Sequence, residues 1–111
     1  MAANWVKLFD SAEDAANLFP INTVKTIKID NKRICFGQLH DGFFAIDDTC
    51  PHQAASLGMG DCSPSGYVAC PWHHYLFDLR TGRDIGGTET DLRSYPIRVD
   101  KTGIFIDLLQ L

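Results

Sequence analysis

The chain has 111 residues, of which 45% are hydrophobic and 22% charged, and its formal net charge at pH 7 is -4. This length favours one domain, residues 1–111, with a small core. A mildly acidic chain has no electrostatic reason to bind nucleic acid or an anionic membrane, and no apolar run approaches the roughly 20 residues of a membrane span. The first residues lack a basic stretch followed by an apolar one, so no secretory signal is expected and the predicted location is the cytoplasm.

The chain up to residue 46 is predicted to form strands around one short helix. Ser11 and the acidic residues behind it are typical of a helix start, and Pro20 ends the helix. The alternation of polar and apolar residues from Lys25 onward predicts a half-buried strand. Asp41-Gly42 is a hairpin signal between two strands. The strands expected here are residues 5–9, 23–29, 33–39 and 43–46.

Regular patterning lapses from residue 47 to residue 66, where glycine and proline are frequent. A loop this long in a compact domain is usually functional or disordered. Further strands are expected at residues 67–69, 75–78, 93–99 and 104–108, with Pro96 marking a sheet edge or the start of a strand. Many short strands separated by turns predict an all-β fold. The simplest architecture is a β-sandwich or barrel-like base with a small subdomain inserted at about residues 47–83.

Two short motifs inside that subdomain combine thiols with imidazoles. Cys50-Pro51-His52 is followed, after seventeen residues, by Cys70-Pro71-Trp72-His73. Cys and His bind borderline and soft transition metals, so Cys50, His52, Cys70 and His73 are the predicted metal ligands. A common zinc finger has one pair of cysteines and one pair of histidines, whereas each pair here mixes the two types. A structural zinc module is nevertheless kept as an alternative.

The remaining cysteines are assigned no role. Four cysteines in a secreted chain of this size would suggest two disulfides, but two of the four here stand at metal-ligand spacing. Cys35 lies in an apolar run and is expected to be a buried thiol. Cys62 lies in a stretch rich in glycine, serine and proline and is expected to be partly exposed.

The mixed Cys/His pairs resemble the Rieske [2Fe-2S] centre, in which two cysteines hold one iron and two histidines the other. Residues 47–52 are similar to the first cluster loop of that family, residues 70–82 to the second loop with its following strand, and residues 93–99 to the strand that returns to the base. The resemblance implies one [2Fe-2S] cluster. It also implies that Cys50 and Cys70 hold a buried iron and that His52 and His73 hold an outer iron near the surface.

Departures from the family pattern favour its small soluble ferredoxins. Respiratory Rieske proteins join a further cysteine of each loop in a disulfide, and the matching positions here are Ala55 and Trp72. High-potential members place a serine and a tyrosine hydroxyl where this chain has Tyr75 and Phe77. The expected reduction potential is therefore about -150 mV, the low end of the Rieske range. The third, covering loop of the family corresponds to Ile85-Gly86-Gly87-Thr88, which lacks its proline.

The resemblance implies an electron carrier that is not catalytic alone and is monomeric when free. It would pass electrons from a flavin-dependent NAD(P)H reductase to a terminal oxygenase. The alternative within the family is a small subunit of a larger enzyme such as NAD(P)H nitrite reductase. His40 is expected in a turn and His74 beside the ligands without a catalytic role. Most acidic residues near the ligands are expected to be solvated, and any patch they form would suit a basic docking face; they are Asp47, Asp48, Asp61, Asp84, Glu89 and Asp91.

Overall fold

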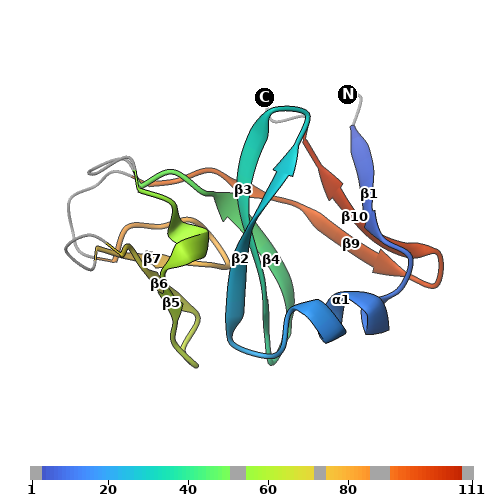
Figure 1. Ribbon diagram of the computed structural model, residues 1–111, viewed down its shortest axis with the longest axis horizontal. Helices are drawn as coiled ribbons and strands as arrows, with labels where there is room; N and C mark the ends of the chain where they lie inside the picture. Colours follow the sequence, from blue (N-terminus) through green and yellow to red (C-terminus); the bar gives the residue numbers. More distant parts are fainter. Residues whose placement is uncertain (1–3, 51–54, 72–74, 86–90, 109–111) are drawn as a thin grey trace.

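The computed structural model describes residues 4–50, 55–71, 75–85 and 91–108 (Figure 1). Its elements, in chain order, are β1 (Trp5–Phe9), α1 (Ala12–Leu18), β2 (Thr23–Ile29), β3 (Lys32–Leu39), β4 (Gly42–Asp47), η1 (Leu57–Met59), β5 (Asp61–Cys62), β6 (Tyr67–Ala69), β7 (Leu76–Asp78), β8 (Ser94–Tyr95), β9 (Ile97–Asp100) and β10 (Gly103–Asp107). Strands predominate, so the predicted all-β class is confirmed. Within the described residues no helix is long and apolar enough to cross a membrane.

Three antiparallel sheets build the part of the molecule that the structure describes. The largest has the strand order β2-β3-β4-β8, a second has the order β1-β10-β9, and the smallest has the order β5-β6-β7. Figure 1 shows the smallest sheet to one side of the two larger ones, with α1 below them. This small sheet, residues 61–78, lies within the inserted subdomain predicted at about residues 47–83, whose limits stay a prediction.

Local sequence explains the elements of the base. The Ser11 hydroxyl accepts a hydrogen bond from the backbone N–H of Asp14 at 3.0 Å, and this N-cap starts α1. Asp30 and Asn31 both adopt positive φ, 48° and 69°, between β2 and β3. Such a backbone is typical of the two-residue hairpins that match strand twist. The predicted helix and the predicted strands at residues 23–29 and 33–39 are therefore confirmed, and β3 pairs with β4 across the predicted Asp41-Gly42 turn.

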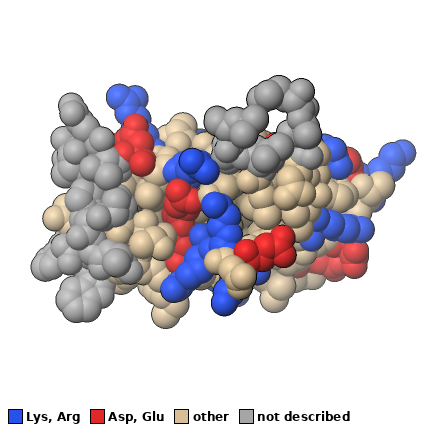
Figure 2. All heavy atoms as spheres, turned by 90° about the horizontal axis from the view of Figure 1, so that it is seen from above, with Lys and Arg blue, Asp and Glu red and all other residues tan. Residues whose placement is uncertain are grey.

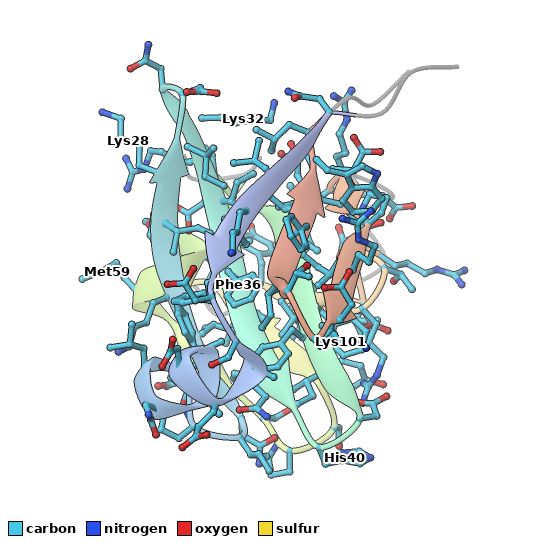
Figure 3. The ribbon with its side chains drawn as sticks, turned by 90° about the vertical axis from the view of Figure 1, so that its right-hand side faces the viewer. Lys28, Lys32, Phe36, His40, Met59 and Lys101 are labelled. Carbon is cyan, nitrogen blue, oxygen red and sulfur yellow. The ribbon has the colours of Figure 1, made fainter. Side chains whose placement is uncertain are left out.

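Strand β3 separates two apolar cores. Its side chains alternate between faces, so Ile34 and Phe36 enter the core between the two larger sheets and α1, whereas Cys35 and Leu39 enter the core beneath the small sheet. Figure 3 shows Phe36 inside the molecule and His40 at the β3–β4 turn, where the sequence predicts it. The second core, called here the small-sheet core, also contains Cys50 and Cys70.

The structure differs from the sequence prediction in two segments, residues 47–66 and residues 93–99. The stretch from residue 47 to residue 66 contains a 3-10 turn, η1, and a short strand, β5. The single strand predicted at residues 93–99 is two strands, because β8 pairs with β4 and β9 pairs with β10. Pro96 stands between them and has no N–H to continue a ladder. The chain therefore passes from the largest sheet to the second one at this proline.

Candidate metal centre

The two motif cysteines stand at the start of two loops that are closed by the same backbone hydrogen bond. The Cys50 N–H donates to the carbonyl of Ala55 at 2.8 Å, and the Cys70 N–H donates to the carbonyl of Tyr75, also at 2.8 Å. In both cases the acceptor stands five positions after the cysteine (50 to 55 and 70 to 75). We call residues 50–55 the first ligand loop and residues 70–75 the second ligand loop.

The residues that flank the two loops are also paired in the same way. Thr49 forms a β-bridge with Ser56 around the first ligand loop. Ala69 pairs with Leu76 around the second one, as part of the β6–β7 register. Each cysteine therefore directly follows a β-paired residue, which fixes its backbone at the base of a hairpin.

Both cysteines are fully buried and belong to the small-sheet core. No disulfide forms among the four cysteines, all of which lie in the described part of the chain. Two thiols at matching loop bases in one apolar core are suited to bind a soft metal centre shielded from water. His52 and His73, the two predicted imidazole ligands, lie outside the described residues, as do Trp72 and His74.

The segment that leaves the first ligand loop packs against the strand that leads into the second. Asp61 of β5 pairs with Ala69, the residue before Cys70. A Cβ at Gly60 would stand only 1.9 Å from the Ala69 carbonyl oxygen, so only glycine permits this approach. The β5–β6 pairing and Gly60 therefore bring the bases of the two ligand loops to the same part of the fold.

A third segment runs beside the strand that leaves the second ligand loop. Asp84 forms a β-bridge with Phe77, and the Ile85 N–H donates to the Leu76 carbonyl at 2.9 Å. The predicted covering loop, residues 85–88, therefore starts next to β7. Its residues 86–88 lie outside the described part.

The prediction that the acidic residues are mostly solvated needs correction at two positions. Asp48 is completely buried and Asp84 is 7% exposed. Asp47 is half-buried and accepts hydrogen bonds from the Tyr95 hydroxyl and the Arg93 N–H. Asp61 and Asp91 are exposed, as predicted, and Glu89 lies outside the described residues. On the face drawn in Figure 2, basic and acidic side chains are interspersed.

Asp48 is the polar residue at the site that sequence reasoning missed. Its carboxylate accepts hydrogen bonds from the Thr26 hydroxyl at 2.8 Å, the Ser56 hydroxyl at 2.5 Å and the Gly58 N–H at 2.8 Å. The Arg33 guanidinium lies 3.6 Å away. These partners come from β2, β3 and the segment after the first ligand loop, and no local sequence pattern brings them together. Asp48, Thr26, Ser56, Gly58 and Arg33 are called the Asp48 node below.

The two other cysteines match their sequence predictions. Cys35 is fully buried, and Cys62 is partly exposed. Burial raises the pKa of the Cys35 thiol first of all, and the nearby side chains of Asp48 and Cys62 raise it further. Burial also raises the pKa of the Cys62 thiol. Both groups are therefore disfavoured as thiolates, the form that binds metals.

Comparisons with known proteins agree with this geometry. A sequence model of the Rieske [2Fe-2S] domain matches residues 4–96. The ferredoxin component of the p-cumate 2,3-dioxygenase system of Pseudomonas putida is 47% identical over 68 residues, which are 60% of this chain and 57% of that protein. The chain thus spans little more than half the length of this curated relative.

Two solved structures share the fold over nearly the whole chain. The ferredoxin of carbazole 1,9a-dioxygenase from Nocardioides aromaticivorans IC177 has a TM-score of 0.80 at 23% identity, with 96% of this chain and 99% of that one covered. A putative NADH-dependent nitrite reductase small subunit from Mycobacterium tuberculosis has a TM-score of 0.82 at 17% identity, with 100% of both chains covered. At such identities the likeness establishes the fold.

Proposed function

Because this chain belongs to the Rieske [2Fe-2S] domain family, we propose that it carries single electrons between two other proteins. The cofactor of the family is a Rieske-type [2Fe-2S] cluster. When bound, such a cluster supplies one-electron redox chemistry. The proposal assigns to this chain the tasks of holding the cluster, keeping water from its thiolate side and presenting it to partners.

The proposed ligands are Cys50 and Cys70 on one iron and His52 and His73 on the other. The observation that supports the thiolate pair is that both cysteines begin ligand loops closed by the same hydrogen bond and are buried in one core. Each loop also carries one of the two histidines in its sequence. The donor set therefore fits a cluster that is held by one cysteine and one histidine from each loop.

An oxygenase system is the proposed setting of this electron transfer. The relative from Pseudomonas putida is a ferredoxin component of a dioxygenase system. By analogy, a flavin-dependent NAD(P)H reductase would supply electrons, a terminal oxygenase would receive them, and this chain would have no catalytic activity alone. A monomeric state and a cytoplasmic location stay predictions from the sequence, as does the limit of the cluster-binding part at about residues 47–83.

A second candidate is the small subunit of a nitrite reductase. The observation that favours it is the full coverage of both chains in the comparison with the subunit from Mycobacterium tuberculosis. The two settings differ in partner. A carrier is expected to purify as a free monomer from its native cells, whereas a subunit is expected to purify with a large reductase.

Metal analysis and voltammetry of the purified protein test the proposal. We expect two irons and two sulfides per chain, a red-brown colour and a midpoint potential of about -150 mV, the low end of the Rieske range. Because Phe77 offers no hydroxyl to the site, the potential should lie well below the upper end. A colourless zinc protein would contradict the cluster assignment, and a midpoint above about +100 mV, in the upper part of the Rieske range, would contradict the oxygenase setting.

Turnover assays test the absence of catalysis. The reduced protein alone is expected to convert neither an aromatic substrate nor nitrite. Efficient turnover of either compound by the isolated monomer would overturn the carrier role while leaving the ligand assignment intact.

A further inference from the structure

A buried carboxylate stands at the base of the first ligand loop. Asp48 precedes Cys50 by two residues, so their Cα atoms are at most about 7 Å apart. Its side chain is completely buried, although buried carboxylates are rare unless they are paired. An acidic side chain in this place therefore requires a physical reason beyond solubility.

The Asp48 node joins both ends of the first ligand loop to the largest sheet. The Ser56 hydroxyl and the Gly58 N–H come from the chain just after the loop, whereas Thr26 belongs to β2 and Arg33 to β3. The Asp48 backbone takes part as well, because its carbonyl accepts from the Leu57 N–H at 2.7 Å. The node thus fixes where the first ligand loop leaves the fold and where it returns.

Gly58 makes this arrangement possible. A Cβ at Gly58 would stand 2.2 Å from both the backbone nitrogen and the hydroxyl oxygen of Thr26. Any other residue would push the returning chain away from β2 and remove the Gly58 N–H from the carboxylate. The close approach of the two backbones therefore allows the Asp48 contact.

The negative charge of Asp48 also reaches the core that contains the ligand thiols. Burial raises the pKa of the Cys35 thiol first of all, and the nearby Asp48 raises it further. Cys35 is a member of the small-sheet core together with Cys50 and Cys70. The Arg33 side chain is 57% exposed and lies 3.6 Å from the carboxylate. Solvent screens such a cation strongly, so it compensates the buried charge only in part.

We propose that Asp48 is a positioning residue that fixes the first ligand loop and lowers the reduction potential of the cluster through its buried negative charge. This inference rests on the proposed ligands. Reduction places one more negative charge beside a carboxylate in a medium of low dielectric constant, which disfavours the reduced state. Charge and hydrogen bonding around a cluster are among the factors that set its potential.

Opposite shifts in two variants test the charge effect. Asp48→Asn keeps the size of the side chain and removes its charge. We expect a reduced-to-oxidised ratio at least tenfold higher at fixed applied potential, which corresponds to a midpoint higher by about 59 mV for a one-electron couple. Thr26→Val removes one donor and leaves the charge less compensated, so its midpoint should fall. A merely structural role would not move the two midpoints in opposite directions.

Asp61→Asn is the matched control, because Asp61 is an exposed carboxylate on β5 at the same end of the molecule. Its midpoint should differ from that of the unaltered protein by much less than that of Asp48→Asn. Equal shifts in Asp48→Asn and Asp61→Asn, or shifts of the same sign in Asp48→Asn and Thr26→Val, would overturn the charge effect. If Asp48→Asn fails to fold, the midpoint of Thr26→Val decides whether the charge effect holds: a lower midpoint supports it and a higher one overturns it.

Hydrogen exchange of backbone amides tests the positioning role without relying on the potential. Ser56→Ala should accelerate exchange at Leu57 and Gly58 and leave the amides of the β6–β7 pair unchanged. Unchanged exchange at Leu57 and Gly58 would overturn that role. Failure of the proposed function has a different signature, because in that case the unaltered protein itself would contain no [2Fe-2S] cluster.

Discussion

The two ligand loops are closed by the same backbone hydrogen bond but are supported in different ways. The first ligand loop depends on side chains, because the Asp48 node ties it to β2 and β3. The second depends on backbone pairing, because Val68 and Tyr67 of β6 pair with Phe77 and Asp78 of β7. Two loops closed by the same hydrogen bond are thus held in place by different means, one by a few buried polar groups and the other by a local strand ladder.

This difference determines how each loop should respond to change. A strand ladder spreads its support over several backbone hydrogen bonds between residues that are close in sequence. The Asp48 node concentrates its support in one carboxylate whose partners are distant in sequence. Removal of one side chain should therefore disturb the first ligand loop more than the second.

The largest expected effect is the same for both loops. Cys50→Ala or Cys70→Ala removes a thiolate ligand and should abolish the visible absorption and the cluster iron, with a marked loss of stability because metal binding is coupled to folding. Iron analysis and the visible spectrum provide the measurement. Cys62→Ala is the control and should keep the cluster. Full iron content in either ligand variant would remove that cysteine from the site.

Gly60→Ala should disturb both loops at once, because Gly60 stands where the chain that leaves the first loop meets the strand that leads into the second. The added Cβ meets the Ala69 carbonyl oxygen at 1.9 Å, and relief of such a clash should lower the free energy of unfolding by about 1–3 kcal/mol. Urea denaturation of the cluster-loaded protein measures it. The neighbouring Met59 side chain is 77% exposed and points outward in Figure 3, so Met59→Ala should change stability by less than about 0.5 kcal/mol. Equal effects of the two variants would contradict the close approach.

A smaller effect is expected at a polar contact at the end of the β6–β7 pair that lies opposite the second ligand loop. Arg80 forms two hydrogen bonds with the Asp41 carboxylate, at 2.8 and 2.9 Å, and a third with the Ser65 carbonyl at 3.1 Å. Because the pair is partly exposed and solvent screens such a pair, Arg80→Gln should lower the stability by less than Gly60→Ala does. A double-mutant cycle with Asp41→Asn isolates the pair. A coupling energy as large as the effect of Gly60→Ala would show that the β6–β7 pair also depends on a concentrated polar contact.

The smallest expected effect is the pH dependence of the stability that the Arg80–Asp41 pair contributes. The hydrogen bonds from Arg80 lower the pKa of Asp41 below its ordinary value. A lowered pKa in the folded state contributes stability above the unfolded pKa, about 3.9, and this contribution disappears as the pH falls through the folded pKa. The stability difference between the unaltered protein and Asp41→Asn should therefore shrink below about pH 4. A difference that is constant down to pH 2 would contradict the lowered pKa.

Much of the fold could be predicted from the sequence because its signals are local. The alternation in residues 23–29, the Asp41-Gly42 turn and the Ser11 cap each act within a few residues, and the structure confirms the elements they predict. The spacing of Cys50 and Cys70 relative to His52 and His73 also indicated the family, which the comparisons confirm. Metal chemistry restricts ligands to few residue types, so such a motif is recognisable without a structure.

Tertiary structure alone decided how the two ligand loops are supported. Asp48 looked like one of several solvated acids, and it is buried because Thr26 and Ser56 arrive from elsewhere in the chain with hydroxyl groups that face it. The change of sheet at Pro96 likewise depended on which strands were available as neighbours on each side. Polar contacts between distant residues leave no periodic pattern in a sequence, because their partners are selected by packing rather than by chain neighbourhood.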